Sequence, residues 1–593
     1  MSDAAANPSN RQDLPLCDLV MKGGITSGVV YPGAVAEIAK SYRLKGIGGA
    51  SAGAIAAALT AAAEYGREVR DAEGCGGFDR LAALPAEIAP KLLEKFQPDP
   101  PFKPLFGLFT ALLGRARWKM GHVLWRALAG YPGSTLGIIA AGAIASVLLW
   151  RYDAIGWGAF AILVTVVALA AVTTCRLAAT VARLAHADFG LCSMKTQPGA
   201  PGPALTDWLT EAIDRVAGRK RTDTPLTFGD LADTSGGRHG VQLSVMTSDL
   251  MTRRPYSLPF TGHEHYFSER EFRRLFPDRV VDAMVAKSAA LPDGRQTGPK
   301  DLRYMPAPEH LPVVVAARMS LSFPLLIQAV PMWKCDYTLA TRQAQRTPRR
   351  CLFSDGGLTS NFPIHFFDRL LPNTPTFAIS LGAYAAERDR TGVASDAARI
   401  HMPVKAQDGL FLPIAPIAGL GGFAMRLLDT AKDWQDNLQS ILPGHRDRIV
   451  RIDLKDDEGG INLTMPPETV KRLNDLGVLA GKRVTTKPAA GGFSLDNHRW
   501  TRFLVAMSRM ERSLGEIDAA YDGGPDVPGF AEFFRRYRFG GFYKPESAEW
   551  KDLLLNRADT LRDLGAEWAA KPNIATGKAV PRADTIMRVT PRF

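Results

Sequence analysis

The chain has 593 residues, which is more than one hydrophobic core of typical size needs, so two or three structural units are expected. Lysine and arginine give a net charge of +12, but they do not gather into long basic runs. This balance argues against a nucleic-acid partner, and it fits either anionic lipid headgroups or an ordinary solvated basic surface. The six cysteines form no C-x-x-C pair, which suits a reducing compartment and argues against zinc, so neither a metal nor another cofactor is expected. They are Cys17, Cys75, Cys175, Cys192, Cys335 and Cys351.

The first segments predict a tail, a strand and a glycine-rich turn. Residues 1–14 are polar and lack the pattern of a signal peptide, so a disordered tail and a cytoplasmic body are expected. Residues 16–21 predict a buried strand that runs into a turn at residues 22–28 and then a helix at 29–39.

The glycine-rich turn is expected to expose backbone amides. It has neither the G-x-G-x-x-G nor the P-loop spacing, so phosphate binding is disfavoured. The amides of Gly23, Gly24 and Ile25 are therefore predicted to form part of an oxyanion hole. The alternative is a tight turn whose glycines serve geometry alone.

Residues 49–53 read G-x-S-x-G between an apolar run ending at Ile47 and an alanine-rich helix predicted for 54–65. A strand, a sharp turn and a helix in this order present a serine as a nucleophile, with Gly49 and Gly53 allowing close backbone approach. Ser51 is thus the predicted nucleophile, and the amide of Ala52 is a predicted oxyanion donor. The G-x-S-x-G pattern alone is weak evidence for a nucleophile, so the assignment of Ser51 depends on the motifs before and after it in the sequence.

Residues 127–150 and 154–175 contain no charged residue and are separated only by Arg151, Tyr152 and Asp153. Each segment exceeds the roughly 20 residues needed to cross a bilayer, so a transmembrane helical hairpin is predicted. Aromatic residues cluster at its turn, and basic residues lie at the opposite ends, which places the turn outside and both flanking halves in the cytoplasm. A bacterial inner membrane suits this charge pattern. The alternative is a buried helical pair inside a large soluble core.

Beyond the hairpin, a Pro/Gly linker at 196–203 returns the chain to a helix at 205–216. Strands are predicted at 241–246, 313–316 and 377–381, and their alternation with helices indicates an α/β sheet. The hairpin is therefore interpreted as an insertion.

Asp355 ends an apolar run and precedes Gly356 and Gly357, so its carboxylate should be held rigidly. It is either a turn former or the base that takes the proton of Ser51. His365 would complete a Ser-Asp-His order, but its phenylalanine neighbours are typical of packing, and the oxyanion loop of α/β-hydrolases is missing. A dyad is favoured over a triad.

The last part of the chain predicts helices at 425–442, 468–479 and 497–514, with a strand at 448–454. No chemistry can be assigned to it.

Three motifs in order, at residues 23–28, 49–53 and 355–357, resemble those of the patatin-like phospholipase family. Residues 247–250 and 316–324 support the resemblance, which covers roughly 16–384. It implies a three-layer α/β/α sandwich and a Ser51-Asp355 dyad acting on phospholipid or lysophospholipid acyl esters. The sequence departs from the family's glycine loop, because Ile25 replaces a glycine and Ser27 a basic residue. Backbone amides can still form the hole, but the cation of the family's loop is missing at Ser27.

These expectations combine into a membrane-associated serine acyl hydrolase with a lipid bilayer as partner. The expected units are a tail (1–14), a catalytic domain in two parts (15–126 and 176–384), an inserted transmembrane hairpin (127–175) and a mixed C-terminal extension (385–593). A neutral-lipid or thioester hydrolase is the enzymatic alternative. A catalytically weak membrane-anchored scaffold is the alternative of another class, and the oligomeric state stays open.

Overall fold

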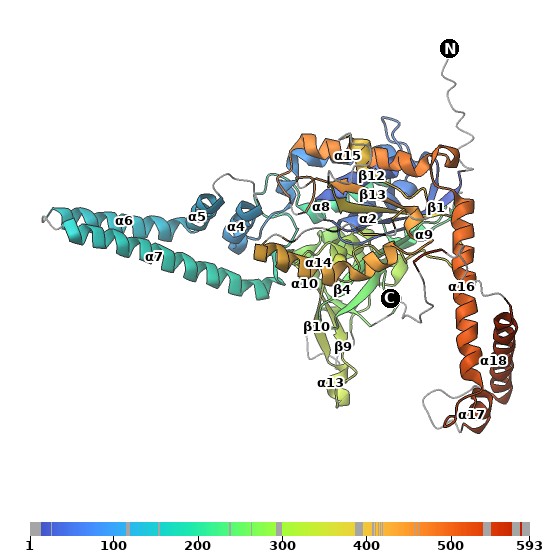
Figure 1. Cartoon of the computed structure of the whole chain (residues 1–593). Coiled ribbons are helices and arrows are strands. Elements are labelled where there is room, and N and C mark those ends of the chain that lie inside the picture. Colours follow the sequence, from blue (N-terminus) through green and yellow to red (C-terminus); the bar gives the residue numbers. More distant parts are fainter. Residues whose placement is uncertain are drawn as a thin grey trace, which may run out of the picture.

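The computed structural model shows a mixed α/β protein built around one large sheet (Figure 1). It describes residues 14–24, 26–113, 119–151, 155–235, 239–262, 264–291, 299–385, 395–405, 408–409, 411–412, 414, 417, 419–455, 457–460, 462–537, 547–571 and 581–583. The tail predicted for residues 1–14 lies, apart from Leu14, outside the described residues, and so do Ile25 and the hairpin turn at 152–154.

Within the described residues the sheet has 11 strands. Across the sheet they are β12 (Ile400–His401), β13 (Ile449–Leu454), β11 (Thr376–Ala383), β1 (Leu16–Met21), β2 (Arg43–Gly49), β4 (Gln242–Asp249), β10 (Pro348–Asp355), β9 (Val330–Cys335), β6 (Tyr266–Ser268) and β7 (Leu302–Tyr304), and β5 (Arg254–Leu258) pairs with β4. The central pairs from β13 to β4 are parallel, whereas β10 pairs with β4 antiparallel. A separate parallel pair joins β3 (Gly190–Cys192) and β8 (Leu325–Ile327).

The first strand shows why the centre of the sheet is buried on both faces. Leu19 and Met21 of β1 join the main apolar core, whereas Val20 between them joins a second cluster on the other face. Such a run of apolar residues without polar alternation is typical of a parallel strand that is covered on both sides. The carboxyl ends of β1 and β2 therefore meet at one edge, which brings the glycine-rich turn beside Ser51.

Helices cover the main core face. They are α1 (Tyr31–Ile38), α2 (Ala52–Tyr65), α3 (Gly77–Ile88), α8 (Leu205–Val216), α12 (Val313–Ser320) and α15 (Pro467–Thr485). The strand predicted at 313–316 is wrong, because these residues begin α12 directly after Pro312. All eight residues of α12 are buried, and an apolar run of this length does not distinguish a buried helix from a buried strand. On the second face Phe362, Ile364 and Phe367 pack against the sheet.

The C-terminal extension is part of the same body, because its strand β13 pairs with β11 and its helix α15 packs on α1. A Cβ on Gly477 would lie 1.9 Å from the carbonyl oxygen of Val30, so a side chain there would push the two helices apart.

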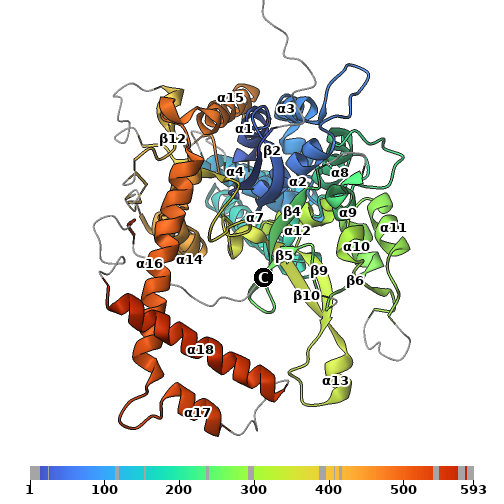
Figure 2. The ribbon, with the colours of Figure 1, turned by 90° about the vertical axis from the view of Figure 1, so that its right-hand side faces the viewer.

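The helices α16 (Leu495–Tyr521), α17 (Phe530–Arg536) and α18 (Ala548–Ala569) form a separate group at the edge of the body (Figure 2). The shorter helices are α9 (Phe228–Ala232), α10 (Glu269–Leu275), α11 (Asp278–Ala286) and α13 (Arg342–Arg346).

The predicted hairpin corresponds to α6 (Pro132–Trp150) and α7 (Ile155–Ala182), which project together from the body (Figure 1). Two short helices, α4 (Lys103–Leu113) and α5 (Lys119–Ala129), precede it. Both α6 and α7 are long and apolar enough to cross a membrane, and only 6% of the most apolar window of each is buried. The alternative of a helical pair inside a soluble core is therefore wrong.

Candidate active site

Ser51 occupies the sharp turn between β2 and α2 that its sequence motif predicts. Its backbone has φ 55° and ψ −128°, a left-handed conformation that is unfavourable for a residue with a side chain. The residue directly precedes the first turn of α2, and it is 4% exposed. A nucleophilic serine at a strand-to-helix elbow has this combination of strain and helix-terminal position.

The predicted partner of Ser51 lies within hydrogen-bond distance. The Ser51 hydroxyl donates to Oδ2 of Asp355 at 2.6 Å, although the two residues are 304 positions apart in the chain. Asp355 ends β10, and its other oxygen, Oδ1, accepts the backbone N–H of Gly357 at 2.7 Å. Both oxygens are thus held, and one of them faces the serine.

The environment of Asp355 changes its acidity. Burial raises the pKa of this carboxyl from 3.8 to about 6, against the opposing effects of the hydrogen bonds from Ser51 and Gly357 and of the Lys432 charge. A carboxylate whose pKa lies just below neutral pH is still largely ionised, and it is a stronger proton acceptor than an exposed aspartate.

Two further serines, for which no role was predicted, support the dyad. The Ser320 hydroxyl, at the end of α12, accepts the backbone N–H of Ser51 at 2.9 Å. The carbonyl oxygen of Ser322 accepts the backbone N–H of Asp355 at 3.0 Å. Both serines lie in the segment 316–324, and their contacts with Ser51 and Asp355 depend on how this segment packs, which a sequence motif does not show.

Three of the predicted oxyanion donors, Gly23, Gly24 and Ala52, lie beside Ser51, and the amides of Gly23 and Ala52 are engaged by backbone carbonyls. The fourth, Ile25, lies outside the described residues. The N–H of Gly23 donates to the carbonyl of Asn361 at 2.7 Å, and the N–H of Ala52 donates to the carbonyl of Gly24 at 3.1 Å. The Gly24 carbonyl also lies 3.2 Å from the Ser51 hydroxyl. In this conformation the Gly24 carbonyl therefore takes one donor that an oxyanion would need.

His365 is not a hydrogen-bond partner of the dyad. Its ring packs edge-on against Phe366, with 5.2 Å between the ring centroids, and burial lowers its pKa. The geometry therefore supports a dyad without this histidine. Among the described residues no group of three or more histidine, cysteine, aspartate or glutamate side chains is arranged to hold a metal ion.

An apolar cavity opens next to the elbow. It encloses about 820 Å³, part of it open to solvent, and its wall includes Ala52, Ile55, Leu84, Trp208 and Leu321. Cavities that bind small ligands are likewise mostly apolar. The cavity adjoins the elbow, because its wall includes Ala52, the residue that follows Ser51.

The chain is 33% identical to the RpoH suppressor of Rhizobium meliloti (strain 1021), over 97% of this chain and 99% of that protein. No family model matches the chain. The crystal structure of VipD from Legionella pneumophila aligns over 93% of this chain and 85% of that one, with 14% identity. Its TM-score of 0.28 is too low to support an inference.

Proposed function

The chain belongs to the family of the RpoH suppressor of Rhizobium meliloti (strain 1021), and we propose that it is a membrane-associated serine acyl hydrolase acting on phospholipids or lysophospholipids. The observation that carries the proposal is the 2.6 Å hydrogen bond from Ser51 to Asp355 at a strained elbow. The patatin-like α/β/α sandwich, with the membrane hairpin inserted into it, is part of the same proposal.

In the proposed reaction Asp355 takes the hydroxyl proton while Ser51 Oγ attacks the ester carbonyl carbon. The carbonyl oxygen becomes an oxyanion, and the alcohol leaves with the proton from Asp355. Water then attacks the acyl-serine and gives a proton to Asp355, and this proton returns to Ser51 Oγ as the acid is released. The Ala52 amide would stabilise the oxyanion once the Gly24 carbonyl turns away, and the Gly23 amide once it leaves the Asn361 carbonyl. Loss of one such donor typically slows acyl transfer by about 10²–10³-fold.

Two observations support a lipid as substrate. The cavity beside Ala52 is lined by apolar side chains and suits an acyl chain. The helices α6 and α7 would hold the site close to a bilayer, which raises the effective concentration of a lipid substrate.

One observation favours the alternative of a catalytically weak membrane-anchored scaffold. The Gly24 carbonyl accepts the N–H of Ala52, so the predicted oxyanion hole is not open in this conformation. The two functions differ in a property that can be measured, namely the reactivity of Ser51.

We expect a fluorophosphonate probe to label the full chain covalently and the Ser51→Ala variant not at all, because only an activated serine attacks such a phosphorus centre. Labelling is read by gel fluorescence on detergent-solubilised protein. Ser235→Ala is the control, because Ser235 is exposed and its hydroxyl donates to Asp233 at the surface. Folded protein that the probe does not label would contradict the hydrolase and leave the scaffold.

We also expect the labelling rate to fall as the pH is lowered through about 6. Asp355 accepts the serine proton only when it is ionised, and its pKa is about 6. The rate is measured between pH 4 and pH 8, with tryptophan fluorescence as the control for folding. A rate that stays constant down to the ordinary aspartate range would show that no base with a pKa raised to about 6 activates Ser51.

A further inference from the structure

The helix α14 (Gly419–Ser440) carries an apolar stripe that faces solvent. Leu420, Phe423, Leu427, Trp434 and Leu438 follow one another at intervals of three, four, seven and four residues, which places them on one face of a helix with about 3.6 residues per turn. Their side chains are 48–84% exposed. A surface helix of a soluble protein normally turns such a stripe toward the core.

The opposite face of α14 holds the helix on the body by polar contacts. Asp436, which is 3% exposed, accepts the backbone N–H groups of Asn361 at 2.7 Å and Phe362 at 2.8 Å. Its other oxygen accepts the Ser360 hydroxyl at 3.1 Å. The orientation of α14 is therefore opposite to that of an ordinary surface helix. Its charged face contacts the protein, and its apolar face is exposed to solvent.

These contacts place α14 directly beside the dyad. The segment 360–362 begins three residues after Gly357, and the Asn361 carbonyl also accepts the N–H of Gly23. A partner that fixes the position of α14 therefore also fixes the turn after Asp355 and the start of the glycine-rich loop, because residues 360–362 contact both.

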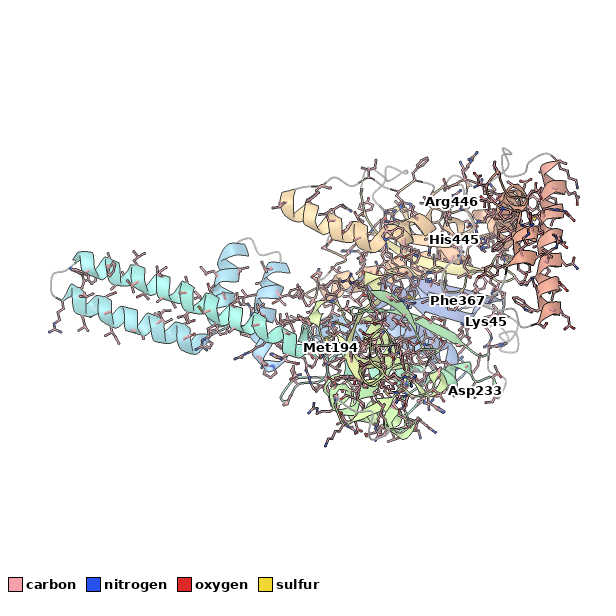
Figure 3. The ribbon with its side chains drawn as sticks, turned by 90° about the horizontal axis from the view of Figure 1, so that it is seen from below. Lys45, Met194, Asp233, Phe367, His445 and Arg446 are labelled. Carbon is pink, nitrogen blue, oxygen red and sulfur yellow. The ribbon has the colours of Figure 1, made fainter. Side chains whose placement is uncertain are left out.

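A lipid bilayer is the partner that fits this stripe. In Figures 1 and 3 the N-terminal end of α14 extends from the body on the same side as α6 and α7. Residues 410–425 contain no charge, and the described side chains Phe411 and Ile414 are exposed. Arg426 follows at once, where a cation can reach lipid phosphates while the apolar residues lie deeper.

We propose that α14 is a second membrane contact, whose apolar N-terminal end enters the same leaflet as the base of α6 and α7 and holds the Ser51–Asp355 site against the bilayer. The inference rests on the proposed membrane association, but it does not require catalysis. It gives the C-terminal extension a role that the sequence did not suggest.

The test measures lipid contact at single positions of the full chain. Cys75, Cys175 and Cys335 are replaced by serine, and an environment-sensitive fluorophore is attached to Phe423→Cys. Leu553→Cys in α18 is the matched control, because Leu553 is 47% exposed and Phe423 is 48% exposed. Val164→Cys in α7 reports on the hairpin. Each protein is reconstituted into phosphatidylethanolamine–phosphatidylglycerol vesicles containing nitroxide-labelled lipid.

We expect quenching by the nitroxide lipid at positions 423 and 164 but not at 553. Quenching at 164 with none at 423 would overturn the role of α14 and leave the hairpin in place. No quenching at either position would overturn both membrane contacts. A probe at 423 that is shielded from aqueous iodide, yet not quenched by lipid, would show a covering protein or a second copy and would overturn the proposal as well.

Discussion

Replacement of Asp355 by asparagine is expected to slow the fluorophosphonate reaction of Ser51 by about 10²–10⁴-fold, the usual contribution of a general base. The amide keeps the shape of the carboxylate and can still accept the Gly357 N–H, but it cannot take the serine proton. The second-order labelling rate is measured at pH 7 with equal amounts of folded protein.

The same variant is expected to be more stable than the parent at neutral pH. The folded-state pKa of about 6 exceeds the ordinary value of 3.8, so the protonated form is favoured on folding. The protonated carboxyl stabilises the folded state. This effect is complete at a pH below 3.8, the ordinary aspartate pKa, and it is lost as the pH rises through about 6, the pKa in the folded state. The ionised carboxylate then lowers the free energy of unfolding by up to roughly 3 kcal/mol, at about 1.4 kcal/mol per unit.

Denaturant unfolding at pH 4 and pH 8 tests the sign of this change in the free energy of unfolding. Asp355→Asn should gain stability relative to the parent at pH 8 but not at pH 4. Ser51→Ala separates the two effects, because it removes the nucleophile and leaves the buried charge in place. A less stable Asp355→Asn variant at pH 8 would show that hydrogen bonding outweighs desolvation at this carboxylate.

The sequence predicted those parts of the site whose signal is local. β1 spans Leu16–Met21 as expected, and the elbow at Ser51 lies between the predicted strand and helix. Each motif combines a strand end with glycines, so its backbone geometry can be read from a few neighbouring residues. The pairing of Ser51 with Asp355 came from the order of the motifs and agrees with the observed hydrogen bond.

Features that depend on distant contacts were not predictable in the same way. Ser320 contacts the elbow only because α12 lies beneath it, and the residues 313–316 at its start were wrongly predicted as a strand. The role of Asn361 depends on the approach of Gly23 from the other end of the chain. The amphipathic pattern of α14 was visible, but a pattern alone does not show which face meets the protein.

Replacement of Gly53 by alanine is expected to slow labelling by about 10²-fold and to lower the free energy of unfolding. A Cβ at this position would lie 2.3 Å from the carbonyl oxygen of Met21 and 2.7 Å from that of Lys22. Both atoms belong to the backbone at the end of β1, so no side-chain rotation relieves the overlap. Overpacking of this kind typically costs about 1–3 kcal/mol.

Labelling should slow as well, because relief of the overlap moves the elbow relative to Asp355. A displacement of about 1 Å can slow a positioned reaction by about 10²-fold. Gly515→Ala in α16 is the matched control, since nothing lies within 4 Å of its Cβ and alanine favours a helix by about 1 kcal/mol. Thermal unfolding and labelling are measured on both variants. If Gly53→Ala labelled at the parental rate, the close contact between the elbow and β1 would not be what holds Ser51 in place.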